Sequence, residues 1–287
     1  MALTSPGLIK AANDALVGIS PDINIAKLFA YDMSDEFADY GTTVKVPVAT
    51  ATASELALTG ESINDYETDS GSISYANVVL NHQPKATFKA PKAADFEAPN
   101  APYWGRMTTA LVNAVDGNIS TVLGGLFTAA ACTGGKVVLA SVTKASVAEL
   151  ITKCAGRVSD TVLGLDPVGY ATLLSLLDVS AYGGGEAIRT GYIPGLYGFK
   201  AVIQLKDLPS GVIGALIPST AVAVAARKTI KDEEGFIEAG TVMDENGFPI
   251  TITRHFSAAK RYTFLNADVL WGAALVQPTK VKYLAAS

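Results

Sequence analysis

The chain has 287 residues, of which 49% are hydrophobic and 17% are charged, and its net charge at neutral pH is −5. This length can bury a sizeable core, and the low share of charge indicates a surface that is partly reserved for neighbouring subunits. An acidic chain without a basic stripe does not fit a sequence-reading DNA-binding protein.

The charge is unevenly distributed along the chain. Residues 1–100 contain six Lys and Arg against 13 Asp and Glu, whereas residues 101–287 contain 16 against 14. An acidic first third and a faintly basic remainder could attract each other between subunits. Ordinary solvated loops explain the same distribution equally well.

Neither the cysteines nor the apolar stretches predict an exported or membrane protein. Cys132 and Cys154 lie in apolar surroundings without metal-ligand spacing, so we expect free buried thiols and folding in a reducing cytoplasm. Residues 1–6 do not resemble a signal peptide. The uncharged stretches 117–135 and 208–226 are broken by Gly, Ser and Thr, so we expect no membrane partner.

The first 50 residues predict an extended arm followed by a strand. A short helix is expected at 8–17, and an acidic run follows at 31–40, without a period that would bury one continuous face. An irregular segment of this length fits an arm that lies on a neighbouring subunit. Residues 41–50 alternate as a strand, and Pro47 places that strand near an edge or end of a sheet.

Two strand-like segments, 72–80 and 85–90, predict a long hairpin that turns at residues 81–84. The segments contain few large apolar residues, and an isolated two-stranded hairpin is at best marginally stable in water. We therefore expect another surface, such as a neighbouring subunit, to support it. Its candidate contact residues are Tyr75, Lys85 and Lys89.

A long helix of about 22 residues should follow Pro99 and Pro102, with a length of roughly 33 Å. Residues spaced three and four apart form one apolar stripe, which is typical of an amphipathic helix. The stripe consists of Trp104, Thr108, Leu111, Val115, Ile119, Val122 and Leu126.

Beyond Gly135 the pattern predicts mixed helices and strands, and the C-terminal part predicts mainly strands. Helices are expected at 146–157 and 167–177, and strands at 137–140, 162–165, 199–205, 213–217 and 222–226. Further strands are expected at 236–237, 241–242, 250–254, 262–265 and 269–276. Asn246-Gly247 is a strong hairpin signal between two of them.

The segment 182–202 is rich in glycine. Its glycines, which include Gly191, Gly195 and Gly198, predict a shaped loop that leads into a strand. The one nearby cation, Arg189, is interpreted as an ion-pair partner between subunits. The glycines lack the spacing of a phosphate-binding loop, and Glu186 would repel phosphate, so no anion site is expected.

The sequence offers no plausible catalyst. Its two histidines, His82 and His255, occur without metal-ligand spacing or a nucleophile motif. The acidic turns 231–235 and 244–246 lack the alternation of a calcium loop. We therefore predict no catalytic residue, no cofactor and no metal.

Two parts of the chain resemble a known family. The order of strand 162–165, Asp166-Pro167, helix, Arg189-x-Gly-x-Ile193 and Gly195-Leu-x-Gly-Phe199 resembles the axial domain of tailed-phage major capsid proteins with the HK97 fold. Residues 271–283, in which Pro278 separates two β segments, resemble the terminal strands of that family.

The resemblance implies an α+β, HK97-like capsid fold and a division of the chain into six parts. These are an N-terminal arm at 1–40, a peripheral-domain strand at 41–54, an extended hairpin loop at 55–95, a peripheral domain with a long spine helix at 96–135, an axial domain at 136–235, and terminal strands at 236–287 that return to the peripheral and axial domains.

The function that the resemblance implies is structural. Copies would form the pentamers and hexamers of an icosahedral shell around the double-stranded DNA of a tailed bacteriophage, without sequence-specific contact to it. The protein would belong to the virion and assemble in the cytoplasm of the host bacterium. Besides sister copies, the implied partners are a portal, a separate scaffolding protein (because the chain begins almost directly with the arm), and cement or decoration proteins.

Three further readings stay open. An encapsulin, which is a bacterial compartment with the same fold, would enclose a protein cargo instead of a genome. An α/β enzyme would need a convergent polar site. Some members of the resembled family join subunits through an isopeptide bond between Lys and Asn, for which Lys85, Lys89, Lys92 and Asn266 are the available residues, although none of them can be placed on the family's positions.

Overall fold

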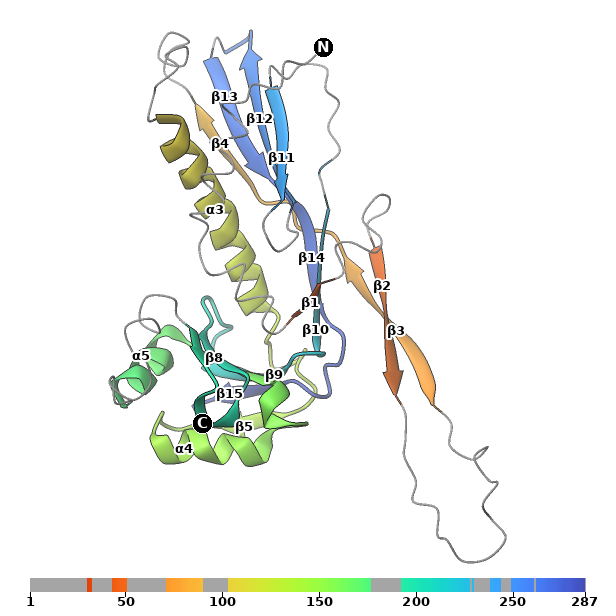
Figure 1. Cartoon of the computed structure of the whole chain (residues 1–287), viewed down its shortest axis with the longest axis vertical. Coiled ribbons are helices and arrows are strands. Elements are labelled where there is room, and N and C mark those ends of the chain that lie inside the picture. Colours follow the sequence, from red (N-terminus) through yellow and green to blue (C-terminus); the bar gives the residue numbers. More distant parts are fainter. Residues whose placement is uncertain are drawn as a thin grey trace, which may run out of the picture.

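The computed structural model describes residues 30–32, 43–50, 71–89, 103–176, 192–227, 229, 238–243, 249–260 and 262–286. The described part is elongated (Figure 1). A long helix and a four-stranded sheet form one end, a six-stranded sheet with two helices forms the other, and a two-stranded ribbon projects away from the body. The expected helix at 8–17 and the turn at 246–247 lie outside the described residues.

The long helix α3 (Tyr103–Gly125) confirms the helix predicted after the two prolines. Its 23 residues correspond to a rod of about 35 Å. The buried side chains recur every four residues, and Leu123 takes the buried position where the sequence predicted Val122, which is only half-buried. The buried stripe consists of Leu111, Val115, Ile119 and Leu123.

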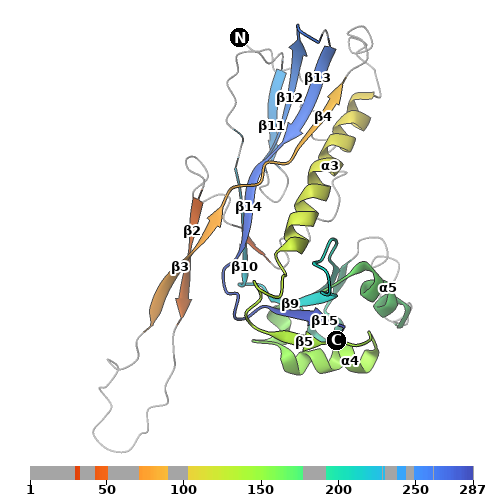
Figure 2. The same ribbon diagram turned by 180° about the vertical axis from the view of Figure 1, so that it is seen from behind.

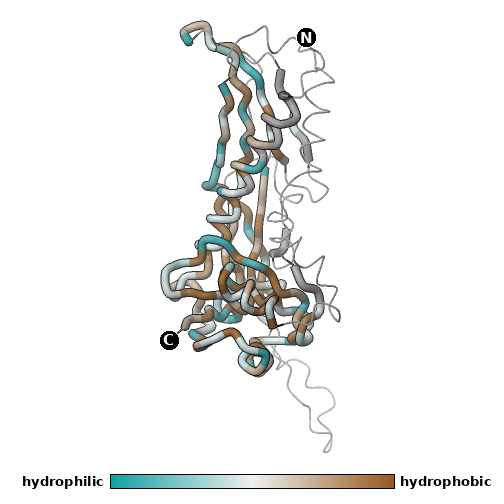
Figure 3. Tube along the Cα trace, turned by 90° about the vertical axis from the view of Figure 1, so that its left-hand side faces the viewer, coloured by the Kyte–Doolittle hydropathy of each residue, from teal (hydrophilic) through white to brown (hydrophobic). Residues whose placement is uncertain are grey.

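A four-stranded antiparallel sheet packs against α3, in the order β11-β12-β13-β4. Its strands are β4 (Lys85–Lys89), β11 (Glu238–Met243), β12 (Pro249–Ser257) and β13 (Tyr262–Asp268). Alternate residues of the strands, such as Ile252 and Leu265, join the same buried cluster as the stripe of α3. Both hydrophobic and hydrophilic positions occur along this part of the chain (Figure 3), as expected of a sheet with one buried face.

A six-stranded sheet forms the other end of the molecule, in the order β5-β15-β9-β6-β8-β7. Its strands are β5 (Lys136–Val138), β6 (Thr161–Leu165), β7 (Tyr192–Pro194), β8 (Ala201–Gln204), β9 (Gly214–Pro218) and β15 (Lys282–Ala285). The helices α4 (Lys144–Leu150) and α5 (Pro167–Leu176) contribute to a buried cluster with one face of this sheet. The helix predicted at 146–157 is shorter, because a 3-10 turn at Ile151–Lys153 ends it.

A three-stranded sheet connects the two ends (Figure 2). It contains β1 (Ala30–Asp32), β10 (Val222–Arg227) and β14 (Leu270–Leu275), with β1 parallel and β14 antiparallel to β10. Within the stretch 136–235, strands β5 to β9 belong to the six-stranded sheet, whereas β10 pairs with β1 and β14. Conversely, the last strand, β15, returns to that sheet beside β5 and β9.

The projecting ribbon consists of β2 (Thr43–Thr50) and β3 (Ser72–Val79). The predicted pairing of 72–80 with 85–90 is wrong, because β3 pairs with β2 while β4 pairs with β13. Residues 81–84 do not reverse the chain as a tight hairpin turn would, and His82 instead forms an isolated bridge with Trp271 of β14. The true hairpin connection is the stretch 51–70.

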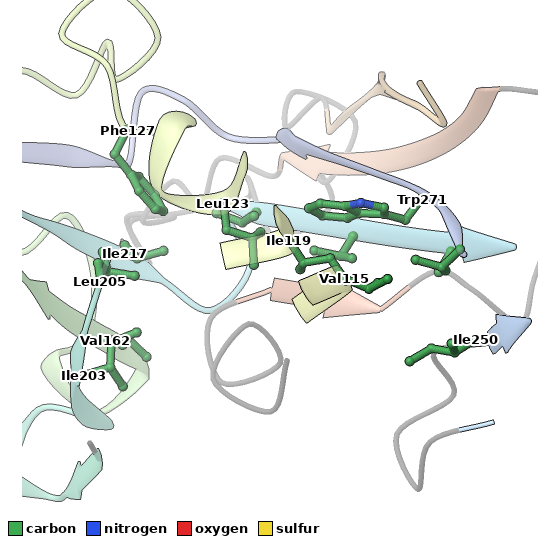
Figure 4. Close-up of a cluster of buried hydrophobic side chains, with 14 of the residues drawn as sticks. Val115, Ile119, Leu123, Phe127, Val162, Ile203, Leu205, Ile217, Ile250 and Trp271 are labelled. Carbon is green, nitrogen blue, oxygen red and sulfur yellow. The ribbon is translucent and has the colours of Figure 1, made fainter. Parts of the chain in front are cut away.

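One buried cluster links α3 to all three of the larger sheets. It includes the stripe of α3, Ile217 from the six-stranded sheet, Trp271 from the three-stranded sheet and Ile250 from the four-stranded sheet. Figure 4 shows these side chains converging on the helix from both ends of the molecule. The two ends therefore share a continuous core, in which each methylene group removed from water stabilises the fold by about 0.8 kcal/mol.

Gly272 marks the place where β14 and the ribbon approach most closely. A Cβ atom at this position would collide with the backbone carbonyl of Val79 at the base of β3. We predict that Gly272→Ala lowers the free energy of unfolding by about 1–3 kcal/mol, because two backbones would have to separate. Chemical denaturation of the soluble subunit measures this loss.

The matched control is Gly125→Ala, at the end of α3, where an added Cβ meets no atom within 4 Å. We expect this change to leave stability unchanged or slightly raised, because Ala favours helix more than Gly. Equal stability of the two variants would contradict the close approach of β14 and β3.

Candidate functional site

The ribbon has two different faces. Residues Val44, Val46 and Val48 of β2 are buried, as is Val78 of β3. The opposite face carries Ile73 and Tyr75, each 66% exposed, and Val79, 45% exposed. On β2 this outer face continues with Thr43, Lys45, Pro47 and Ala49, which pair with the odd-numbered residues of β3.

The buried face of the ribbon is supported by the chain itself. Val44, Val46, Val78 and Leu80 form a cluster with Ala223 and Ala225 of β10, and Leu270, Ala274 and Val276 pack against it. For the base of the ribbon, the expected supporting surface is therefore the chain's own β10 and β14 and not a neighbouring subunit. The signal available in the sequence was the alternation of valines at 44, 46 and 48, which marks one apolar face.

The outer face of the ribbon stays exposed in the folded subunit. Isoleucine side chains are usually buried and tyrosine side chains are often partly buried, and their joint exposure on one face of a projecting ribbon is characteristic of an interaction surface. Tyr75, a candidate contact residue predicted from the sequence, lies on this outer face together with Ile73 and Val79. Figure 1 shows β2 and β3 extending away from the helices and the other sheets.

The glycine-rich loop is described only from residue 192 onwards, so Arg189 and Gly191 lie outside the described residues. Gly195 and Gly198 both adopt positive φ, at 67° and 82°, and Tyr197 between them has φ of 53°. The turn is closed by a hydrogen bond from the Phe199 amide to the Leu196 carbonyl at 3.0 Å. Three positive-φ positions within four residues make this a sharply shaped turn, as the glycine spacing predicted.

Lys85 and Lys89 do not lie on the projecting ribbon. Both are exposed residues of β4 in the four-stranded sheet, opposite Asp268 and Phe264 of β13. The ammonium group of Lys89 lies 3.6 Å from the ring centroid of Tyr262, a cation–π contact within the chain.

Asn266, the other residue considered for a covalent link, is engaged within its own sheet. Its Nδ2 atom donates to Thr253 Oγ1 at 3.3 Å and lies 3.1 Å from His255 Nδ1. Lys92 lies outside the described residues.

The described residues do not bring a catalytic constellation together. His82 packs its ring against Trp271, with 5.7 Å between ring centroids, and His255 stacks on Phe264 at 5.3 Å. Burial raises the pKa of the Cys132 thiol to about 11, which keeps it protonated at neutral pH.

Two features that the described residues lack are relevant to function. Among them, no three His, Cys, Asp or Glu side chains lie close enough together to hold a metal ion. Within the same ranges, no helix has both the length and the apolar character needed to cross a membrane.

The chain has the fold of solved capsid proteins. It is similar to the capsid protein of Ralstonia phage GP4, with a TM-score of 0.58 and 10% identity over 89% of this chain and 86% of the other. The capsid of a native GTA particle gives 0.57 and 14% over 93% and 90%. A virus-like particle from Pyrococcus furiosus gives 0.53 and 11% over 97% and 98%. No family model and no curated protein matches the sequence.

The positive φ of Gly198 gives a direct test of the turn. A Cβ at this position would meet only Val158 Cγ1, at 3.7 Å, so the cost of a side chain comes from the backbone rather than from a collision. We predict that Gly198→Val lowers the free energy of unfolding by about 1–2 kcal/mol, since the left-handed region penalises a residue with a Cβ.

Gly156→Val is the matched control, because an added Cβ there meets nothing within 4 Å and the residue does not have positive φ. Thermal unfolding of both variants measures this difference in stability. A Gly198 variant as stable as the Gly156 variant would mean that the turn does not need its glycine.

Proposed function

We propose that this chain, which has the fold of capsid subunits, is the major capsid protein of a tailed double-stranded DNA bacteriophage with HK97-type architecture. The observation that carries the proposal is the likeness to capsid structures across nearly the whole length of both chains. The second support is the ribbon, which projects from the body with an exposed apolar face.

In this proposal the parts of the chain take the roles of an HK97-type subunit. Residues 1–40 are the arm, and the ribbon β2–β3 with its connection is the extended loop, so the loop begins at the strand that the sequence analysis assigned to the peripheral domain. The helix α3 is the spine of the peripheral domain, together with the four-stranded sheet. The six-stranded sheet is the axial domain.

In this proposal, assembly is driven by contacts between copies and needs no catalytic step. The outer face of each ribbon, with Ile73, Tyr75 and Val79, packs on the adjacent copy and removes apolar surface from water. Each large side chain that becomes buried contributes roughly 1.5–3 kcal/mol. Because every copy makes such contacts in a closed lattice of pentamers and hexamers, individually weak interfaces produce a stable shell.

The glycine-rich turn belongs to the contacts around the axis of a pentamer or hexamer in this proposal. Gly191, Gly195 and Gly198 shape the loop, and Arg189 forms an ion pair with a neighbour. Gly198→Val should therefore yield soluble subunits that assemble poorly. Lys85 and Lys89, on the exposed face of the four-stranded sheet, are further contact residues between copies.

The proposed partners follow from the shell function. They are sister copies, a separate scaffolding protein, a portal and cement proteins, and the packaged DNA is enclosed without sequence-specific contact. An acidic chain with a net charge of −5 suits this role, since a strongly basic lining would bind the genome too tightly for release. Assembly would take place in the cytoplasm of the host, and the mature protein would be part of the virion.

A second candidate is a compartment shell that encloses protein cargo. The observation that favours it is the similarity to the virus-like particle from Pyrococcus furiosus, which covers 97% of this chain and 98% of the other. The two candidates differ in what the particle contains. Particles purified from infected or induced cells should hold double-stranded DNA in the first case and a protein cargo in the second.

The outer face of the ribbon provides the mutational test. We predict that the double variant Ile73→Asp, Tyr75→Ser abolishes particle formation, because it places a charge on the proposed contact. The isolated subunit should keep its stability within about 0.5 kcal/mol, since both side chains are exposed in it. Sedimentation velocity and negative-stain microscopy measure assembly, and chemical denaturation measures stability.

Val168→Ser is the control, because Val168 is also an exposed apolar residue but lies on α5. This variant should form particles in wild-type yield. Normal particles from the ribbon double variant would contradict the proposed role of the outer face.

A further inference from the structure

The edge strand β5 forms one wall of a groove beside the helix α4. A hollow of about 240 Å³ is lined by residues 137–141 on the strand side, and by Ser146, Glu149, Leu150 and Lys153 on the helix side. The floor is apolar, because Val137, Leu139 and Leu150 are buried. On the rim, Val138 is 60% exposed.

The groove is rigid on its helix side. Thr143 caps α4 through a reciprocal pair of hydrogen bonds with Ser146. Ser146 Oγ also donates to the Ser141 carbonyl at 2.8 Å, which ties the helix to the end of the strand segment. A groove that is already formed costs little conformational entropy when a ligand binds.

The backbone of β5 faces this groove with hydrogen-bonding groups that the sheet does not use. The Leu139 amide donates to the Ala285 carbonyl, and the Tyr283 amide donates to the Gly135 carbonyl, so the odd-numbered residues of this segment point toward β15. Because the direction alternates along a strand, the N–H and C=O groups of Val138 point to the outer side, and Ala140 follows two residues later, just beyond the end of β5. Among the described residues, no strand pairs with that side.

The other edge of the same sheet is unlike this one. It is formed by β7, which ends in Pro194, a residue without an amide hydrogen. Proline at an edge strand discourages the addition of another strand. Of the two edges in the described sheet, β5 is thus the one able to accept a strand, and the hollow beside it can receive a side chain of that strand.

The charges around the groove indicate which charge the added strand should carry. The elements that form the groove carry three lysines, Lys136 on β5, Lys144 on α4 and Lys153 in the turn that follows α4. Residues 136–153 contain a single carboxylate, that of Glu149. The segment 51–70 has the opposite character, with five carboxylates and no Lys or Arg. Its acidic residues are Glu55, Glu61, Asp65, Glu67 and Asp69.

The ribbon determines where the two ends of that acidic segment are attached. Thr50 pairs with Ser72 at one end of the ribbon, and Thr43 pairs with Val79 at the other end, near the cluster with β10. The residues that flank segment 51–70, Thr50 and Ser72, therefore lie at the end of the ribbon opposite its contact with β10. A segment attached at this end of the ribbon is in a position to reach a neighbouring copy.

We propose that the groove between β5 and α4 binds the acidic segment 51–70 of a second copy of this chain by strand addition to β5. The incoming backbone bonds to Val138 and Ala140, one of its apolar side chains fills the hollow, and its carboxylates lie near the three lysines. This inference deepens the proposed shell function by naming a contact between copies, and it rests on that function for the meeting of copies.

The direct test is titration of the soluble subunit with a synthetic peptide of residues 51–70, followed by heteronuclear NMR. We expect chemical-shift changes at the Val138 and Ala140 amides and in α4. A peptide of the same length with each Asp and Glu replaced by Lys should bind at least about tenfold more weakly, because it meets three lysines. Absence of shifts at β5 and α4, or equal binding of the two peptides, would overturn the proposal.

The variant Val138→Pro removes an outward-facing amide without breaking a hydrogen bond to β15, so the subunit should stay folded. It should weaken binding of the acidic peptide about tenfold, whereas Val168→Ser should not change it. If Val138→Pro proves unfolded, Lys153→Glu serves the same purpose, because Lys153 lines the groove and is exposed. Unchanged binding by the folded variant would contradict the strand addition.

Assembled particles provide the second measurement. Particles are formed from a mixture of ¹⁴N-labelled and ¹⁵N-labelled copies and treated with a zero-length carbodiimide, which joins carboxylates to amines. We expect mixed-isotope peptides that link residues 51–70 to Lys136, Lys144 or Lys153. Particles without such links would contradict the contact and leave the shell function intact. A failure to form particles would count against the shell function. In that case the peptide titration would still test whether the groove binds segment 51–70.

Discussion

The buried stripe of α3 is the apolar surface on which the rest of the molecule depends. Leu111, Val115, Ile119 and Leu123 belong to one cluster with side chains from the four-stranded, three-stranded and six-stranded sheets. An antiparallel sheet needs one face covered, and an elongated molecule has little depth in which to cover it. The helix provides apolar surface for the sheets at both ends of the molecule, because its 23 residues run along the body between them (Figure 1).

A body stabilised in this way can hold a ribbon away from itself. The base of β2 and β3 is fixed by valines that pack on β10 and β14, and by the close backbone approach at Gly272. The outer face is left with Ile73, Tyr75 and Val79 exposed. The ribbon is thus folded by its own chain on one side and exposed on the other, which suits the contact between copies that we propose.

The sequence predicted those elements whose signals are local and strong. The four-residue spacing of apolar residues identified α3, and the glycines of the 195–198 turn matched its positive φ values. The resemblance carried by residues 162–199 and 271–283 pointed to the capsid fold that the structure displays. The helix and the turn could be predicted because each follows from residue chemistry within a short window, whereas the capsid fold was implied by the resemblance.

Strand pairing was harder to predict, because it depends on residues far apart in the chain. The four residues between β3 and β4 looked like a hairpin turn, whereas the true partner of β3 lies beyond the stretch 51–70. For the same reason Lys85 and Lys89 were assigned to the ribbon although they pair with β13. Arg189 and Gly191, chosen for the same glycine-rich segment, lie outside the described residues and remain a prediction.

Hydrogen exchange of the ribbon before and after assembly tests the central claim most directly. The amides at the base of β3, such as Val78, should already exchange slowly in the isolated subunit, because the base packs on the body. The amides around Ile73 and Tyr75 should exchange quickly in the subunit and become protected only in the particle. Exchange around Ile73 and Tyr75 that is equally fast in assembled particles would contradict the claim that this face is a contact between copies.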